Sequence, residues 1–239
     1  MTTRLSVFRW SRGERERWQA FDVEAGADTT VLDALVDIQR RRDPSLAFRY
    51  ACRVGMCGSC AMTVNGTPRW TCRTHVDKVA AAGRLEIAPL ANLPVVKDLV
   101  ADMREFFDKW ARAKGQLTPT RTRADDFAVV DPESPARREA DAGIECIGCG
   151  VCYAACDVVK WNRDYLGPAA LNRAWTLVND ARDGGQSPRL HAVAGDAGCH
   201  SCHTMMSCTE HCPKHLSPTR SIAGLKRATW SLPPEGEKP

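Results

Sequence analysis

Cys146-Ile-Gly-Cys149-Gly-Val-Cys152-Tyr-Ala-Ala-Cys156 is the stretch that decides how the second half of the chain folds. A run with the same spacing follows it, Cys202-His-Thr-Met205-Met-Ser-Cys208-Thr-Glu-His-Cys212-Pro213. Two, two and three residues separate the ligand positions, which is the spacing of bacterial ferredoxins, and in two-cluster ferredoxins the fourth cysteine of each run ligates the other cluster. The pair of runs therefore predicts two iron–sulfur clusters.

The second run differs from the first at one ligand position, where Met205 replaces a cysteine. A thioether is a much poorer iron ligand than a thiolate, so one of the two sites has lost a corner. With the fourth ligands crossed, we predict a 4Fe–4S cluster on Cys146, Cys149, Cys152 and Cys212. A 3Fe–4S cluster is then predicted on Cys156, Cys202 and Cys208. This pattern indicates electron transfer.

A third cysteine group lies in the first half of the chain, Cys52-Arg-Val-Gly55-Met-Cys57-Gly58-Ser-Cys60, followed at a distance by Cys72. Gaps of four and two residues before a remote fourth cysteine are typical of plant-type 2Fe–2S sites. Glycine allows the tight turns that direct backbone N–H groups toward sulfur. Four cysteines also suit tetrahedral zinc. That alternative stays open, although the four-residue gap in a glycine-rich loop favours a 2Fe–2S cluster on Cys52, Cys57, Cys60 and Cys72.

The elements around this loop predict a small mixed sheet packed on one helix. Alternating apolar residues indicate strands, an Asn-Gly pair between two strand-like runs indicates a hairpin, and threonine is a good helix N-cap. We expect strands at 5–10, 18–23 and 84–88, a helix from Val31 capped by Thr29 or Thr30, and a hairpin at Asn65-Gly66.

Helical patterns dominate after residue 90. Pro94 is expected to open a helix with an apolar stripe on Val95, Leu99, Met103, Phe106 and Trp110. Residues 115–142 contain several prolines and many charges, which predicts an extended surface segment. Further helices are expected at 167–181 and from Ser217-Pro218, because proline suits the first helical turn.

The predicted fold class is α+β with two domains. Residues 1–100 are expected to form a plant-type 2Fe–2S ferredoxin (β-grasp) domain. Residues 101–239 are expected to form a helical, bacterial-type ferredoxin domain that holds the 4Fe–4S and 3Fe–4S clusters.

Composition narrows the class of protein. A net charge of +4 without a long basic block argues against nucleic-acid binding. Twelve cysteines in 239 residues fall below the density of disulfide scaffolds, and the first 18 residues lack the apolar core of an export signal. No stretch approaches 18 consecutive apolar residues. We therefore expect reduced, metal-bound thiols on the cytoplasmic side, and other chains as anchors if the protein works at a membrane.

These three cysteine groups, in this order, resemble the iron–sulfur subunit of succinate dehydrogenase and fumarate reductase. The resemblance covers nearly the whole chain. It extends to Leu93-Pro-Val-Val-Lys-Asp-Leu-Val100, Leu166-Gly-Pro-Ala169, Asp180-Ala-Arg-Asp183 and Cys212-Pro-Lys-His-Leu-Ser-Pro218.

The resemblance implies a place in a larger oxidoreductase. In this family a flavoprotein subunit with covalent FAD oxidises succinate to fumarate, or runs the reverse. Electrons pass singly through the 2Fe–2S, 4Fe–4S and 3Fe–4S clusters to quinone at membrane anchor subunits, in which haem b stays an open question. The chain would hold no catalytic residue of its own and would be peripheral, on the cytoplasmic face of the inner membrane.

The resemblance also implies three residues at the quinone end. Trp161 matches the tryptophan that meets the quinone, His203 a histidine beside the three-iron cluster, and Lys226 a basic residue near quinone and anchor. An indole N–H can donate to a quinone oxygen, and a cation can stabilise developing negative charge. The alternatives are a core tryptophan, a histidine that only bonds sulfur, and a solvated lysine.

Two residues depart from the family pattern. Asp157 stands where the family usually has proline, as an exposed cap or as a charge near the three-iron cluster and quinone, with Lys160 as its expected helical partner. Cys199 is either a free thiol or a ligand that fills the corner left by Met205. Cys199-His-Ser-Cys202-His203 also matches the haem-attachment motif, which we reject because attachment needs export and would consume a cluster ligand.

Three alternatives to succinate:quinone oxidoreduction remain. The same wire would serve a quinol:fumarate reductase, or a flavoprotein that acts on a related acid. A third reading is a zinc- or cluster-stabilised interaction module without redox turnover.

Overall fold

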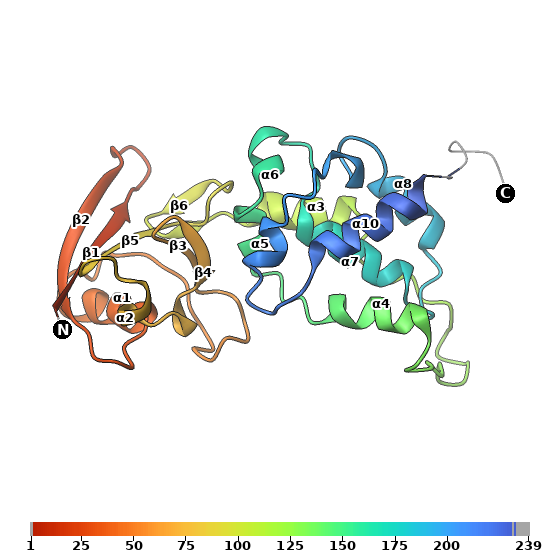
Figure 1. The fold of residues 1–239 in the computed structure, drawn as a ribbon, viewed down its shortest axis with the longest axis horizontal. Helices are drawn as coiled ribbons and strands as arrows, with labels where there is room; N and C mark the ends of the chain where they lie inside the picture. Colours follow the sequence, from red (N-terminus) through yellow and green to blue (C-terminus); the bar gives the residue numbers. More distant parts are fainter. Residues whose placement is uncertain (1, 231, 233–239) are drawn as a thin grey trace. The chain divides into compact units, whose positions relative to one another are not determined.

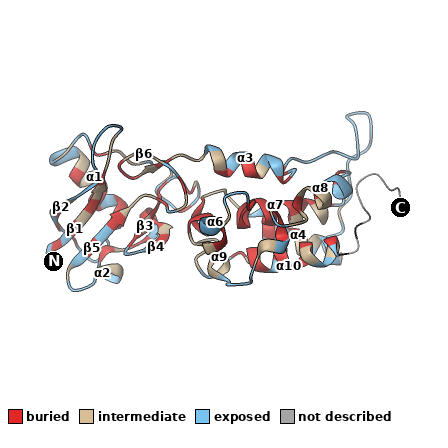
Figure 2. Ribbon diagram, turned by 90° about the horizontal axis from the view of Figure 1, so that it is seen from above, coloured by how far each residue is buried: buried red, intermediate tan, exposed pale blue. Residues whose placement is uncertain are grey.

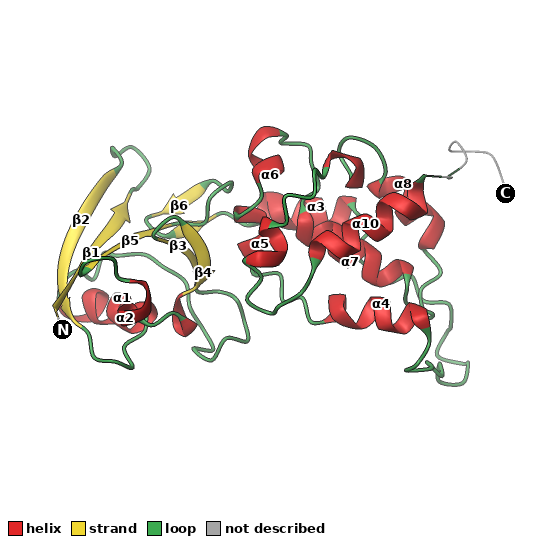
Figure 3. Ribbon diagram, viewed as in Figure 1, coloured by secondary structure: helices red, strands yellow, loops and turns green. Residues whose placement is uncertain are grey.

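The structure is a computed structural model that describes residues 2–230 and 232. Its contacts divide the chain into two compact units. The N-terminal unit comprises Met1–Met103 with Ile147–Ala155, and the C-terminal unit comprises Arg104–Cys146 with Cys156–Pro239. The strands of the first unit and the helices of the second are distinguished by colour in Figure 3.

The N-terminal unit is built on a five-stranded mixed sheet of order β2-β1-β5-β3-β4 (Figure 1). Only the central β1–β5 pair is parallel, and the other neighbours are antiparallel. The strands are β1 (Thr2–Arg9), β2 (Arg17–Glu24), β3 (Ala61–Val64), β4 (Thr67–Trp70) and β5 (Arg84–Ala88). These elements confirm the strands and the hairpin predicted from the alternation of apolar residues.

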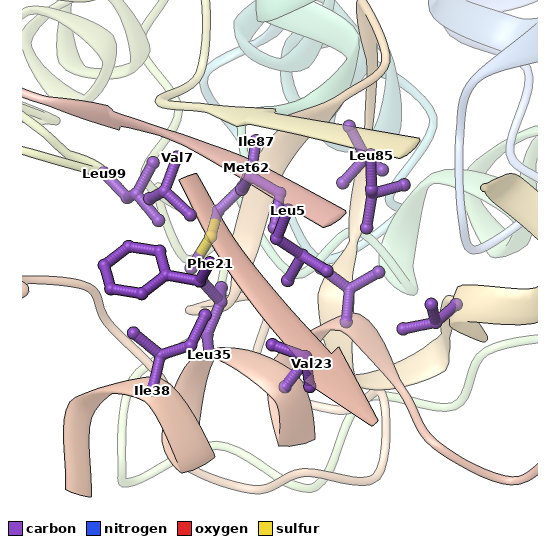
Figure 4. Packing of buried hydrophobic residues seen from close by; sticks show 14 of the residues in the cluster. Leu5, Val7, Phe21, Val23, Leu35, Ile38, Met62, Leu85, Ile87 and Leu99 are labelled. Carbon is purple, nitrogen blue, oxygen red and sulfur yellow. The ribbon is translucent and has the colours of Figure 1, made fainter. Parts of the chain in front are cut away.

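Helix α1 (Val31–Arg41) covers one face of this sheet. Leu35 and Ile38 of α1 pack with Leu5 and Phe21 of the strands in the buried cluster of Figure 4. Thr30 caps the helix: its side chain accepts from the Asp33 N–H, and the Asp33 carboxylate accepts from the Thr30 N–H. The predicted helix and one of its two proposed caps are confirmed, and its apolar face forms the core of this unit.

The helix predicted from Pro94 is wrong over its first half. The chain forms a small hairpin there, β6 (Val95–Lys97) and β7 (Val100–Ala101), and α3 (Arg104–Arg112) begins only afterwards. Asp98 sits at the turn with a φ of 47°, which a helix does not allow. Its buried carboxylate accepts from the backbone N–H groups of Trp10 and Ala47. Long-range hydrogen bonds therefore override the local helical pattern.

The extended segment predicted for 115–142 is also wrong at its end, because α4 (Pro135–Ile144) begins inside it. Ser134 accepts from the Arg137 N–H as the N-cap, and Pro135 occupies the first turn. Proline at this position lacks only an N–H that would have no partner in the helix anyway.

The C-terminal unit is organised around α7 (Pro168–Val178), which packs against α3, α4, α8 and α10. Most of α7 is buried, as Figure 2 shows. Gly224 of α10 lets that helix approach closely, because a Cβ there would lie 2.5 Å from the Trp175 ring. The remaining elements of this unit are α6 (Asp157–Trp161), α8 (Gln186–Val193), η2 (Cys199–Ser201), α9 (Ser207–Glu210) and α10 (Pro218–Thr229). The helices predicted at 167 and 218 are confirmed.

A buried ion pair connects α8 to the loop that precedes it and to the segment that follows α3. The Arg189 guanidinium contacts the Asp183 carboxylate at 2.8 Å, and both side chains are at most 1% exposed. Arg189 also donates to the carbonyls of Lys114 and Gln116.

Within the described residues, no helix is both long and apolar enough to span a bilayer.

Candidate iron–sulfur sites

The first candidate site is the loop from Cys52 to Cys60 in the N-terminal unit. The β3–β4 hairpin returns the chain from Cys60 to Cys72, which lies in η1 (Thr71–Arg73). Thr71 holds the two together, because its N–H and its hydroxyl both donate to the Cys60 carbonyl, at 3.2 and 2.9 Å. Distant positions in the sequence thus become neighbours through one hairpin.

The loop turns its backbone N–H groups toward sulfur. The N–H groups of Met56 and Cys57 donate to Cys52 Sγ at 3.2 and 3.3 Å. Gly55 has a φ of +74°, and a Cβ there would lie 3.1 Å from the Arg73 side chain and 3.2 Å from the Trp70 ring. Such N–H groups stabilise thiolates, and only glycine fits this crowded left-handed position without strain.

The thiols of this loop have divergent acidities. Hydrogen bonds from Ser59, followed by the backbone at Cys52, lower the pKa of Cys57 to about 6. Burial, followed by the contact with Cys60, raises the pKa of Cys72 to about 11. Bound iron would overcome the raised pKa of Cys72, because metal ligation requires all the ligating thiols to be thiolates and releases their protons. The donor set and the glycine-lined loop fit a 2Fe–2S cluster.

The segment that carries Cys149 and Cys152 belongs to the N-terminal unit. Asn92 Nδ2 donates to the carbonyls of Tyr153 and Ala154 in α5 (Val151–Ala154), at 3.1 Å each. Gly58 of the first loop has a φ of +70°, and a Cβ there would lie 2.5 Å from Cys149 Cβ. The first cysteine loop and the second therefore touch through a glycine, a contact that the sequence analysis did not predict.

The other two predicted four-iron ligands, Cys146 and Cys212, lie in the C-terminal unit. An ion pair of 3.0 Å joins their neighbours, Glu145 and Lys214. The assignment of Cys146, Cys149, Cys152 and Cys212 to one cluster rests on their spacing.

Another candidate site is a small, partly open cavity in the C-terminal unit. Cys156, Cys202 and Cys208 all line it, together with Met205, which stands at the position of the missing fourth cysteine. Tyr165 closes part of the wall and is 1% exposed. Three thiols and a thioether around one space are the donor set expected for a three-iron cluster.

Hydrogen-bond donors surround the sulfurs of this cavity. The Thr204 N–H donates to Cys202 Sγ at 3.4 Å, and the Thr219 hydroxyl lies 3.4 Å from Cys208 Sγ. Burial raises the pKa of Cys156 to about 11 and outweighs the backbone hydrogen bonds at Val159 and Val158, which lower it. Repulsion from Cys208 and Cys202 adds to the rise. Burial likewise raises the pKa of Cys208. Ionising all three thiols requires compensating positive charge, which the irons of a cluster supply.

The residues predicted at the quinone end are all in the C-terminal unit. Trp161 ends α6 and is 66% exposed, so the alternative of a core tryptophan is wrong. His203 lines the cavity, and among the described residues it has no hydrogen bond to sulfur. Lys226 Nζ donates to the Cys202 carbonyl at 2.6 Å, which ties α10 to the cavity loop.

The two departures from the family pattern lie in different places. Asp157 lines the cavity, but its expected ion pair with Lys160 is absent from the described part of the chain. Cys199 is fully buried and does not belong to the cavity wall. Its sulfur lies 3.5 Å from the Thr229 hydroxyl, which also bonds His200 Nε2 at 3.0 Å. The structure thus packs Cys199 against Thr229, outside the wall of the cavity.

Comparisons with known proteins agree with these sites. A family model described as "2Fe-2S iron-sulfur cluster binding domain" matches residues 4–108, and one described as "4Fe-4S dicluster domain" matches residues 145–217. The chain is 38% identical over 230 residues to the succinate dehydrogenase iron–sulfur subunit of Paracoccus denitrificans, covering 93% of this chain and 86% of the relative. The chain belongs to the family of succinate dehydrogenase iron–sulfur subunits.

Solved structures place the same fold in this family. A chain of the Mycobacterium smegmatis Sdh1 complex in the apo form aligns with a TM-score of 0.84 and 25% identity, covering 95% of both chains. A hypothetical protein from Helicobacter pylori shares the fold alone, with a TM-score of 0.61 and 14% identity over 98% of this chain and 41% of that one. These matches confirm the predicted α+β fold, with a 2Fe–2S ferredoxin domain before a helical ferredoxin domain. As an iron–sulfur subunit of succinate dehydrogenase, the chain is an oxidoreductase component that transfers electrons.

Proposed function

We propose that this iron–sulfur subunit carries electrons one at a time between a flavoprotein subunit with covalent FAD and membrane quinone, through three clusters. The 2Fe–2S cluster would be held by Cys52, Cys57, Cys60 and Cys72, the 4Fe–4S cluster by Cys146, Cys149, Cys152 and Cys212, and the 3Fe–4S cluster by Cys156, Cys202 and Cys208. Substrate chemistry belongs to the partner, so the chain contributes ligation, burial and hydrogen bonds that set the cluster potentials.

The observation that carries this proposal is the cavity of the C-terminal unit. Cys156, Cys202 and Cys208 come from two separate segments of the chain, yet they line one small cavity. Met205 lines the same space where the repeat would place a fourth thiolate. A site with three strong ligands and one poor one favours a cluster that lacks one iron.

A contact in the N-terminal unit supports electron transfer between the predicted 2Fe–2S and 4Fe–4S clusters. Gly58 of the predicted 2Fe–2S loop lies against Cys149, a predicted ligand of the 4Fe–4S cluster. The backbone next to the predicted 2Fe–2S ligand Cys57 would therefore lie against a predicted 4Fe–4S ligand, which suits a transfer step between the two clusters.

At the quinone end, the role of each side chain follows from its chemistry. Trp161 is exposed and its indole N–H can donate to a quinone oxygen, and His203 on the cavity wall can stabilise negative charge on the reduced quinone. Lys226, held by the Cys202 carbonyl, adds positive charge to the same region of the C-terminal unit. Anchor subunits would supply the membrane attachment, at the cytoplasmic face of the inner membrane.

A second candidate function differs in the direction of the reaction or in the acid on which the flavoprotein acts. A quinol:fumarate reductase would use the same ligands, and a flavoprotein for a related acid would use the same wire. The related-acid alternative draws on Asp157, whose carboxylate lines the three-iron cavity where the family pattern has proline.

The test begins with the complex purified anaerobically from the source cell. We expect about nine irons and ten acid-labile sulfides per iron–sulfur chain, the sum of one cluster of each type. We also expect a co-purifying flavoprotein that reduces quinone with succinate and not with other dicarboxylates. A chain purified with zinc and without sulfide would contradict the wire, and turnover with another acid alone would replace succinate as the substrate.

A further inference from the structure

The 2Fe–2S loop lies in a part of the chain that contains no carboxylate. Between Asp43 and Asp77 there is neither Asp nor Glu, although 29 of the 239 residues are acidic and a window of that length would hold about four at the average density. Four arginines fall in the same window, at Arg49, Arg53, Arg69 and Arg73. All four candidate ligands lie inside it, so the sequence around this site is strongly cationic.

The structure leaves these positive charges unpaired by acids. Arg49 donates to the Ala101 carbonyl, Arg53 stacks over the Tyr50 ring at 5.1 Å, and Arg69 Nε is buried without a partner. None of the four arginines makes an ion pair with a carboxylate of the described residues. No direct ion pair therefore neutralises these guanidinium groups within the described residues.

Arg73 has the most direct relation to the ligands. It follows Cys72 in the sequence, and its side chain crosses the loop, with Cγ and Nε each 3.1 Å from where a Gly55 Cβ would be. Arg73 Nη2 donates to the Val54 carbonyl at 3.1 Å. The same peptide unit ends in the Gly55 N–H, which favours the Cys72 thiolate and so opposes the rise that burial causes in the pKa of Cys72. A cation on the carbonyl side polarises that N–H and strengthens its bond to sulfur.

This arrangement has a consequence for reduction. Each electron that the cluster accepts adds one negative charge to the cluster and its four thiolates. Nearby positive charge and N–H donors stabilise this more negative state, and both factors set the potential of iron–sulfur centres. We propose that the arginines of this carboxylate-free window, Arg73 foremost, raise the reduction potential of the 2Fe–2S cluster. The inference rests on the proposed function, because it assumes that Cys52, Cys57, Cys60 and Cys72 hold that cluster.

Three variants and one control test the charge. Arg73→Gln removes the charge and keeps an amide donor for Val54, whereas Arg73→Lys keeps the charge. Arg53→Gln removes the charge that follows Cys52 in the sequence, from a side chain that lies over the Tyr50 ring. Arg15→Gln is the matched control, because Arg15 is an exposed arginine in the turn before β2, and β2 is the sheet edge opposite to β4.

The measurement is the midpoint potential of the 2Fe–2S signal, by EPR of the anaerobically purified complex titrated with dithionite and mediators. In Arg73→Gln we expect the ratio of reduced to oxidised cluster at the wild-type midpoint to fall about threefold to tenfold, where tenfold is about 59 mV for one electron. Arg73→Lys should recover at least half of that loss, Arg53→Gln should show a smaller loss, and Arg15→Gln should match the wild type.

The possible results distinguish a failure of the proposed function from a failure of the inference about the arginines. A wild-type complex without a 2Fe–2S signal overturns the proposed function. A wild-type signal whose midpoint is the same in Arg73→Gln and Arg15→Gln overturns the inference alone, as does an equal loss in Arg73→Lys and Arg73→Gln. If Arg73→Gln does not retain the cluster, Arg53→Gln decides, and a midpoint equal to that of Arg15→Gln then overturns the inference.

Discussion

The contact between Gly58 and Cys149 makes a sharp prediction about the Gly58→Ala substitution. Alanine there meets two penalties, the left-handed φ of +70° and a Cβ only 2.5 Å from Cys149 Cβ and 3.0 Å from its Cα. A non-glycine residue at positive φ costs about 1–2 kcal/mol. Carbon atoms prefer separations of about 3.5–4.0 Å, so one loop must move by roughly 1 Å, and forced overpacking costs about 1–3 kcal/mol more.

Gly66→Ala separates these two penalties. Gly66 has nearly the same φ, +74°, but nothing lies within 4 Å of a Cβ built there. We expect Gly66→Ala to lower the free energy of unfolding by about 1 kcal/mol, roughly 2–4 °C in midpoint temperature, with its iron content intact. Gly58→Ala should lower the free energy of unfolding by about 2–5 kcal/mol. It should also displace the Cys149 loop, so the iron and sulfide contents should fall because the 4Fe–4S cluster is lost.

Differential scanning calorimetry of the anaerobic complex, with iron and acid-labile sulfide analysis of the same samples, measures both effects. Equal temperature shifts in the two variants, with full iron in each, would refute the claim that the two cysteine loops are in direct contact.

Three further predictions concern the C-terminal unit. Cys199→Ser should leave the three-iron EPR signal unchanged, because Cys199 is packed against Thr229 outside the cavity; loss of that signal would make it a ligand. Trp161→Leu should lower quinone reduction at least tenfold with all cluster signals retained, and an unchanged rate would remove Trp161 from the quinone site. Arg189→Met should cost about 3–5 kcal/mol, roughly 10 °C in thermal unfolding, because it leaves Asp183 buried and unpaired. Arg138→Met, which breaks the exposed pair with Glu133, is its control and should cost about 1 kcal/mol or less; similar shifts in both would contradict the argument.

Burial and hydrogen bonding explain why the Asp183 pair matters. Burial alone disfavours the Asp183 carboxylate, but the Arg189 guanidinium and the N–H groups of Thr118 and Gly185 outweigh it, so the pKa of Asp183 is lowered. A lowered pKa in the folded state means that the pair stabilises the fold above the unfolded pKa of an aspartate, and that this contribution is lost as the pH falls.

The fold was predictable where local signals agree with the tertiary structure. Asn65-Gly66 formed its hairpin, Thr30 capped its helix, and Ser217-Pro218 opened α10, because turn and cap chemistry acts over a few residues. The apolar stripe from Val95 to Trp110 failed for the opposite reason. Asp98 turns the chain there through hydrogen bonds to Trp10 and Ala47, which lie far away in the sequence.

The candidate sites show the same limit. Spacing alone proposed every cluster ligand, since iron–sulfur loops are local motifs. The approach of Gly58 to Cys149, the crossing of Arg73 over the first loop and the burial of Cys199 depend on how separate segments pack. No periodicity in the sequence encodes those contacts, although the absence of carboxylates between Asp43 and Asp77 was already a signal of the charge around the first loop.

The most direct test of the three-cluster wire is a low-temperature EPR redox titration of the anaerobically purified complex. We expect a three-iron signal in the oxidised state and separate 2Fe–2S and 4Fe–4S signals on reduction. We also expect the three-iron signal to stay when Cys199 is replaced by serine and to be lost when Cys208 is replaced. A complex in which the oxidised three-iron signal is absent and a second four-iron signal appears would contradict the assignment of Cys156, Cys202 and Cys208 with Met205 as the open corner.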